Sequence, residues 1–187
     1  YIESFKPLDD LITQKLGGVK STIKLEAYAN NTMMNYEIPF KEPEDIDDFL
    51  DEFQEKFKLA FVNKGFVIAG FYNIKDSLNS QKDVMPNFTS YWVFDLCHIP
   101  FSSVVFDGKD GVPEVGIFAP CAMYVYVKKG ENKIVIGMPT LSTWVSAFGI
   151  KDKKRVKSML KLDKEIKNIL ENLGGIAIKN YNSLKEL

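Results

Sequence analysis

One strongly amphipathic segment constrains the fold of this chain more than any other feature. Seven apolar residues recur at spacings of three and four, which places them on a single stripe of a helix. The stripe consists of Ile46, Phe49, Leu50, Phe53, Phe57, Ala60 and Phe61. Acidic residues open the segment, where the positive end of a helix favours them, and Gly65 suits the left-handed position that ends it. A helix with one such apolar face packs it against another layer.

Alternating apolar residues predict a hairpin on each side of this helix. Residues 23–29 and 34–40 alternate around Asn30-Asn31, a pair that tolerates tight-turn conformations. Residues 116–127 and 133–138 form a second pair around a polar turn. Further strands are predicted at 66–71, 89–98 and 176–178.

A second long amphipathic helix is predicted over 152–173. Shorter helical segments are predicted at 101–106 and near 144–148, and 75–88 is interpreted as a loop or a short helix. The order lacks the regular strand–helix alternation of a parallel, doubly wound sheet. The predicted fold class is α+β, with two layers: a mainly antiparallel sheet covered by two long amphipathic helices.

Length and charge limit the domain count and the partners. A chain of 187 residues without repeats or linkers is expected to form one domain, 1–187. Lys+Arg is 24 and Asp+Glu is 25, whereas nucleic-acid binding needs a basic excess, so no nucleic-acid partner is expected. The acidic run 42–55 and the basic run 151–167 fall on the predicted helices and are interpreted as solvated faces. No apolar run approaches the roughly 20 residues of a membrane span.

The first residue bears on location. The chain begins with Tyr1 and not with Met, which is consistent with the removal of an N-terminal segment. If that segment was a secretion signal, the protein works outside the cytoplasm. A bacterial protein is expected, with a periplasmic or exported location favoured over a cytoplasmic one.

The common catalytic signatures are absent from the sequence. There is no GxxxxGK[ST] phosphate loop, GxGxxG, GxSxG elbow or HExxH motif. His98 is the only histidine, so it would have to serve as the base in every histidine-dependent scheme. The same count excludes metal sites built from several histidines.

Two cysteine-containing segments form the one local cluster that could carry chemistry. The first, Asp95-Leu96-Cys97-His98-Ile99-Pro100, ends a predicted strand, and the second, Phe118-Ala119-Pro120-Cys121-Ala122-Met123, opens another. Cys97 and His98 are adjacent, so they point to opposite faces unless the strand ends or bulges there, as Pro100 allows. The candidate site comprises Asp95, Cys97, His98, Cys121 and Met123.

Three interpretations of the cysteines stay open. Both can be buried small hydrophobic residues, which makes thiols inert. Cys97 and Cys121 can form a disulfide if their Cα atoms lie within about 7 Å. Alternatively they form a functional thiol or soft-metal site with His98 or Met123, for which sulfur ligands favour copper(I) or zinc.

The same segments resemble the DUF302 family (domain of unknown function 302). That family has a strand ending in a Cys-x-x-Pro or Cys-Asn-Pro element, and later a Gly-Leu-Leu-Pro-Cys-like element comparable with Gly116-Ile117-Phe118-Ala119-Pro120-Cys121. The resemblance covers 46–138, with 1–45 and 139–187 as elaborations. His98 stands where Asn is common, and Ala122 where a polar residue is common. The resemblance implies a small α+β fold with an antiparallel sheet, and it implies no activity.

Three functional hypotheses follow. The first is a non-enzymatic binding or accessory protein that takes a small molecule or a soft metal between the strand ends carrying Cys97 and Cys121. The second is a thiol-based enzyme with either cysteine as the nucleophile and His98 as its activating partner. The third is a structural or protein-interaction module with buried or disulfide-bonded cysteines. Homodimerisation through a sheet edge is compatible with all three.

Overall fold

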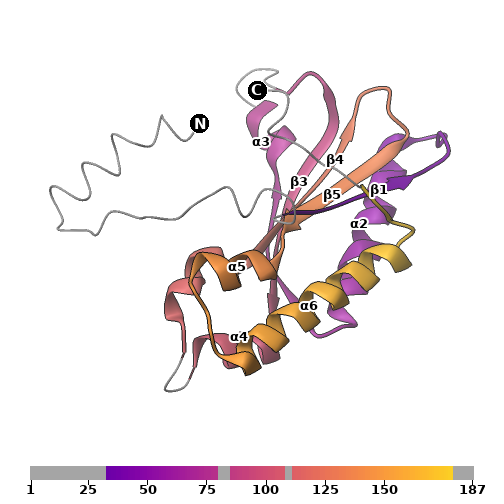
Figure 1. Cartoon of the computed structure of the whole chain (residues 1–187). Coiled ribbons are helices and arrows are strands. Elements are labelled where there is room, and N and C mark those ends of the chain that lie inside the picture. The colour runs from indigo at the N-terminus through magenta and orange to yellow at the C-terminus, as the bar shows by residue number, and fades with distance from the viewer. Residues whose placement is uncertain (1–32, 80–84, 108–110, 179–187) are drawn as a thin grey trace, which may run out of the picture.

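An antiparallel sheet forms the centre of the molecule (Figure 1). The computed structural model describes residues 33–79, 85–107 and 111–178. Over these residues the sheet has six strands in the order β2-β3-β4-β5-β1-β6, so β2 and β6 are its edges. The strands are β1 (Met33–Pro39), β2 (Phe66–Asn73), β3 (Phe88–His98), β4 (Cys121–Lys128), β5 (Lys133–Pro139) and β6 (Ile176–Ala177).

Two long helices and several short ones connect the strands. They are α2 (Ile46–Val62), α3 (Ile74–Asn79), α4 (Ile99–Phe106), the 3-10 helix η2 (Pro113–Phe118), α5 (Leu141–Ala147) and α6 (Lys153–Asn172). The carboxylate of Asp45 caps α2 by accepting hydrogen bonds from the backbone N–H groups of Asp47 and Asp48. After α2 the chain turns through Gly65, whose φ of +83° suits glycine. Among the described helices, none is both long and apolar enough to cross a membrane.

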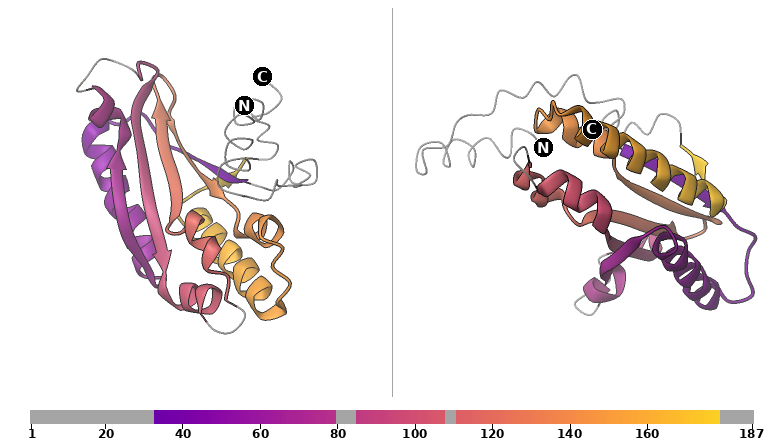
Figure 2. Two further views of the ribbon diagram at one scale, coloured as in Figure 1. Left: turned by 90° about the vertical axis from the view of Figure 1, so that its left-hand side faces the viewer. Right: turned by 90° about the horizontal axis from the view of Figure 1, so that it is seen from below.

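Both long helices pack against side chains of the same face of the sheet, here called the helix-covered face. Figure 2 shows the two helices beside different parts of the strongly twisted sheet. The cross-strand partners Trp92, Val125, Ile136 and Tyr36 form one row on this face. The ring of Phe57 in α2 lies 4.6 Å from that of Phe94, two residues along β3 from Trp92. The hydroxyl of Tyr36 donates to Glu171 of α6 at 3.4 Å. The apolar stripes of α2 and α6 therefore share one core with the inward side chains of the strands.

The predicted α+β class, with its antiparallel sheet and two long helices, is confirmed. The hairpin of β4 and β5 is also present as predicted. The prediction of strand over 116–120 is wrong, because η2 covers residues 116–118 and β4 begins only at Cys121. The predicted strand 23–29 lies outside the described residues, and the described neighbours of β1 are β5 and β6.

Candidate functional site

Strand alternation distributes the five sequence-predicted site residues over both faces of the sheet. His98 ends β3 on the helix-covered face, whereas Cys97 and Asp95 point to the second face. Cys121 and Met123 point into the core, with exposed fractions of 8% and 0%. These residues lie close in the fold without lining a common pocket.

The two cysteines are free, so the disulfide interpretation does not hold in this structure. The sulfur of Cys97 lies 3.6 Å from the hydroxyl of Ser102 in α4. Burial, together with the neighbouring Cys97 and Asp163, raises the pKa of the Cys121 thiol to about 12. A thiol with that pKa remains protonated at neutral pH, whereas nucleophilic attack and metal ligation use the thiolate.

Asp95 takes part in a small polar contact on the second face. Its hydrogen bond with the Tyr72 hydroxyl raises the pKa of that tyrosine, and the negative charge of the carboxylate adds to the effect. Gly70 packs beside this pair, because a Cβ there would lie 2.9 Å from the Asp95 carboxylate. Within 33–79, 85–107 and 111–178, no three His, Cys, Asp or Glu side chains are grouped to hold a metal ion. Asp95 thus has a local packing partner and no cluster of ligands around it.

His98 has a structural role at the junction of β3 and α4. Its Nδ1 accepts a hydrogen bond from the backbone N–H of Phe101 at 3.2 Å, so its side chain caps α4. The ring also packs edge-on against Phe66, with 4.9 Å between centroids. Because Nδ1 is the acceptor, the proton of the neutral ring belongs on Nε2. The imidazole is therefore fixed in orientation and presents an N–H donor.

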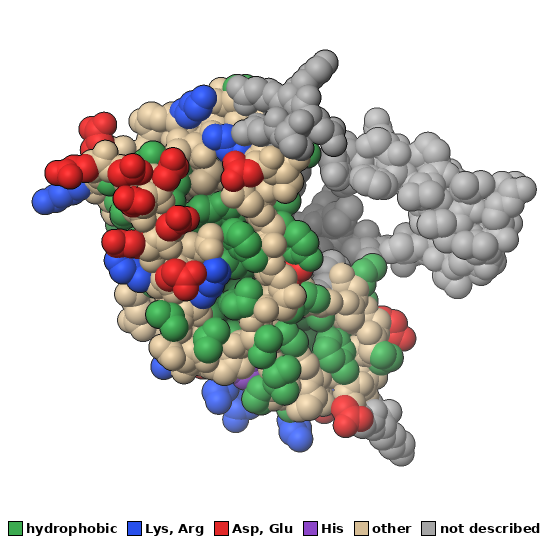
Figure 3. Space-filling view, turned by 180° about the vertical axis from the view of Figure 1, so that it is seen from behind, with side chains coloured by type: hydrophobic (Ala, Val, Ile, Leu, Met, Phe, Trp, Pro, Cys, Tyr) green, Lys and Arg blue, Asp and Glu red, His purple; other side chains and the backbone are tan. Residues whose placement is uncertain are grey.

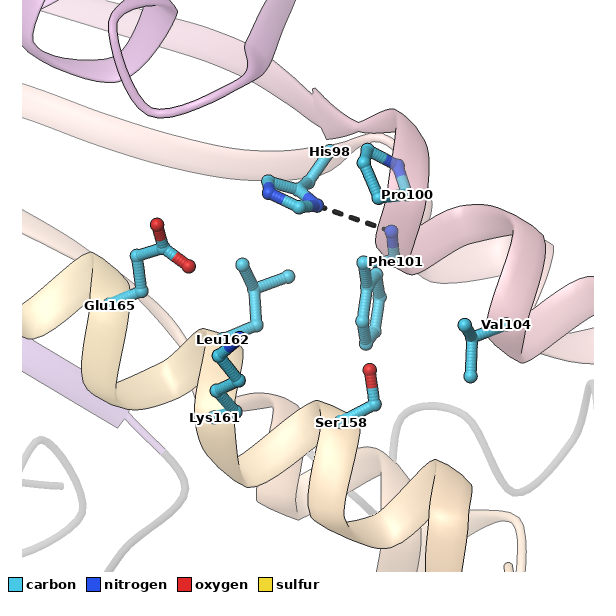
Figure 4. A pocket seen from close by; sticks show the side chains of 8 residues that line it. All are labelled: His98, Pro100, Phe101, Val104, Ser158, Lys161, Leu162 and Glu165. Atoms are coloured by element: carbon cyan, nitrogen blue, oxygen red, sulfur yellow. Dashed lines mark hydrogen bonds between the residues drawn. The ribbon is translucent and has the colours of Figure 1, made fainter.

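A cleft of about 240 Å³ opens beside this ring, between α4 and α6. It is named the His98 cleft and is lined by His98, Pro100, Phe101, Val104, Ser158, Lys161, Leu162 and Glu165. Figure 4 shows the α6 side chains projecting from one wall, opposite His98 and the first turns of α4. Phe101 and Leu162 form a buried apolar floor, whereas the Lys161 ammonium is exposed at the rim. The cleft thus joins an apolar surface to a cation, an imidazole N–H, a hydroxyl and a carboxylate.

Of the residues that line this cleft, only His98 is among the site residues that the sequence predicts. Ser158, Lys161, Leu162 and Glu165 recur at the spacing of one helix face, which was the available signal. That signal lies within the basic run 151–167, which was interpreted as a solvated face. The wall opposite, α4, was predicted as a short helical segment without any expectation of a cavity.

Comparisons with known proteins identify relatives by sequence and by fold. The family model of DUF302, described as a domain of unknown function, matches residues 45–173. The match extends past the expected 46–138 and includes α5 and α6, and with them one wall of the His98 cleft. The crystal structure of an uncharacterised conserved DUF302 protein from Bacillus stearothermophilus is similar, with a TM-score of 0.59 and 17% identity. That similarity covers 74% of this chain and 97% of the other. No curated protein matches.

Proposed function

We propose that this chain, which belongs to the DUF302 family, described as a domain of unknown function, works by binding a small molecule in the His98 cleft. The observation that carries the proposal is the cleft itself, which sets the fixed imidazole ring of His98 opposite the polar side chains of α6. Binding sites commonly combine an apolar surface with a few placed polar groups. The role is non-enzymatic.

The lining favours a small, partly apolar anion whose negative group lies toward Lys161 and away from Glu165, the carboxylate that lines the same cleft. Lys161 supplies the positive charge, while His98 and Ser158 supply neutral donors within the same cleft. Phe101 and Leu162 offer apolar surface for the body of the ligand. A volume of about 240 Å³ lies below the roughly 300–1,000 Å³ of typical ligand pockets, so the ligand is small.

The soft-metal and thiol-enzyme hypotheses receive less support from the cysteine environments. A thiol pKa of about 12 opposes the thiolate that nucleophilic catalysis requires from Cys121. Around either cysteine, no three His, Cys, Asp or Glu side chains of the described residues are grouped to hold a soft metal. His98 directs Nδ1 to the backbone of α4, so that nitrogen is not available to activate Cys97. The third hypothesis, an interaction module, gains support from a different surface, the open edge of the sheet at β2.

The proposal is tested by an NMR titration of the ¹⁵N-labelled chain with 3-methylbutanoate and with its neutral amide. We expect the acid to shift the backbone amide signals of Phe101, Val104 and Leu162 at millimolar concentration. The amide should bind several-fold more weakly, because it lacks the charge that Lys161 attracts. Binding that maps to another part of the molecule, or equal binding of acid and amide, contradicts the assignment.

Two variants and a matched control sharpen the test. Lys161→Ala should weaken binding of the acid to the level of the amide, and Val104→Trp should block both by filling the cleft. Lys164→Ala is the control, because Lys164 is an exposed lysine of α6 that does not line the cleft. Equal losses in Lys161→Ala and Lys164→Ala would indicate only a general effect of net charge.

A further inference from the structure

The strand β2 leaves one edge of the sheet open. It pairs with β3 on one side and is the last strand in the sheet order, so its other backbone edge has no strand partner among the described residues. Its sequence, FVIAGFYN, contains no charged residue and no proline. Soluble proteins usually protect such edges with lysine, proline or a covering segment, because an open edge pairs readily with another strand. A bulge at Ala69 is the one protective feature in β2.

Large apolar side chains are exposed on both faces of this edge. Val67 and Tyr72 project to the second face and are 48% and 50% exposed. Phe71 projects to the helix-covered face and is 38% exposed, with Val62 at the end of α2 49% exposed. These four residues are named the β2 edge patch. Figure 3 shows hydrophobic side chains gathered on this side of the molecule, next to a cluster of acidic side chains.

The charges of α2 differ between its two halves, so that two antiparallel copies of the helix would set opposite charges against each other. Asp47, Asp48, Asp51 and Glu52 lie in the first half, and Glu55 lies just past the midpoint. Lys56 and Lys58 lie in the second half, where each also pairs within its own helix, Lys56 with Glu52 at 3.5 Å and Lys58 with Glu55 at 2.9 Å. The ammonium of Lys58 stands 5.4 Å from the centre of the Phe71 ring, so this flank of α2 borders the patch. Asp51 precedes Lys58 by seven residues, two helical turns, and therefore shares its flank.

We propose that the β2 edge patch binds a second copy of this chain, with β2 paired to β2 in antiparallel orientation about a twofold axis. The pairing continues the sheet across the two copies and covers the open backbone edges. A twofold axis perpendicular to the sheet also sets the two α2 helices side by side and antiparallel. The acidic first half of each α2 then faces the basic second half of the other, as an isologous interface requires.

Sedimentation velocity of the full chain over a range of concentrations tests the proposal. We expect a monomer–dimer equilibrium that weakens at high salt, because exposed ion pairs are screened. Val67→Lys should weaken the dimer at least tenfold, since lysine on an edge opposes strand pairing. Ile176→Lys is the matched control, because Ile176 is 57% exposed on β6 at the opposite edge. Far-UV circular dichroism and urea midpoints establish that both variants fold.

A charge exchange gives a second, independent test of the antiparallel helices. Lys58→Glu alone should weaken the dimer, because it sets acid against acid across the twofold axis. Adding Asp51→Lys reverses the polarity of the flank and should restore dimerisation. A chain that stays monomeric at all concentrations overturns the proposal. So does a dimer that Ile176→Lys dissociates and Val67→Lys does not, and so does a double variant no better than Lys58→Glu.

Discussion

Asp163 tests how α6 is held against α5, because Asp45 makes the same kind of contact at the start of α2 and serves as a comparison. Its carboxylate lies in α6 and accepts hydrogen bonds from the backbone N–H groups of Leu141 and Ser142, at 2.7 and 3.0 Å. Asp45 does the same at the start of α2, at 2.8 and 3.2 Å. Asp163 is only 5% exposed, whereas Asp45 is exposed. The two sites share their chemistry and differ in burial.

The burial difference sets the expected magnitudes. Replacing an exposed N-cap by alanine costs typically about 1 kcal/mol, because water satisfies the freed N–H groups. In Asp163→Ala the N–H of Leu141 cannot reach water, since Leu141 is 0% exposed, and an unsatisfied buried donor costs about 1–3 kcal/mol. The charge-assisted bond to the partly buried Ser142 is lost as well, at about 1.5–3 kcal/mol. Part of this loss is offset because the variant no longer buries a charge. The expected fall in the free energy of unfolding for Asp163→Ala is therefore about 3 kcal/mol.

Urea unfolding followed by far-UV circular dichroism measures both variants by linear extrapolation. Asp163→Ala should lower the free energy of unfolding by about 2 kcal/mol more than Asp45→Ala does. The unfolding slope should stay that of the wild type, so that the comparison refers to the same transition. A difference below about 1 kcal/mol would refute the reasoning, because burial would then not govern the strength of this contact.

Three further predictions concern single side chains. His98→Ala should be less stable in urea than His98→Asn by about 0.5–2 kcal/mol, because both variants lose the ring contact with Phe66 but only alanine loses the cap of α4. In the native protein, mass spectrometry after iodoacetamide treatment should find alkylation at the half-buried Cys97 and none at Cys121 until urea unfolds the chain; early alkylation of Cys121 would contradict its burial. Burial raises the pKa of the Cys121 thiol from 9.0 to about 12, so its protonated form stabilises the fold fully below pH 9.0, and this stabilisation is lost as the pH rises toward 12. Urea midpoints should accordingly fall more steeply with pH in the wild type than in Cys121→Ala over that interval, and parallel slopes would contradict the assignment.

The sequence predicts the layers of this fold well because its signals there are local and periodic. The apolar stripe from Ile46 to Phe61 needs only helical geometry to be recognised, and α2 spans Ile46–Val62. Strand alternation likewise separates Cys97 from His98, which the structure places on opposite faces. The prediction of strand over 116–120 failed because apolar residues in a single 3-10 turn are too few to show their own period.

The His98 cleft cannot be predicted from the sequence, because it depends on how closely α4 and α6 approach each other. His98 and Lys161 are 63 residues apart in numbering (161 minus 98), and nothing local to either indicates that α4 and α6 face each other. The basic run on α6 also resembles any solvated helix face, and only tertiary packing separates Lys161, at the cleft, from Lys164, outside it. Charge patterns on a helix therefore locate its solvent side and leave its neighbours undetermined.

The cap of α4 gives a physical reason for the residue types at position 98. Asn is among the strongest N-cap residues, because its side-chain oxygen accepts from the first turn of a helix. His98 performs the same task through Nδ1, which accepts from Phe101. The imidazole differs in that its second nitrogen carries a proton donor beside the cleft, on the ring that lines it. The cap thus needs only an acceptor such as Nδ1 or an Asn oxygen, whereas a ligand contact through Nε2 needs the histidine ring. His98→Asn, which keeps the cap and removes that donor, should therefore weaken 3-methylbutanoate binding without unfolding α4.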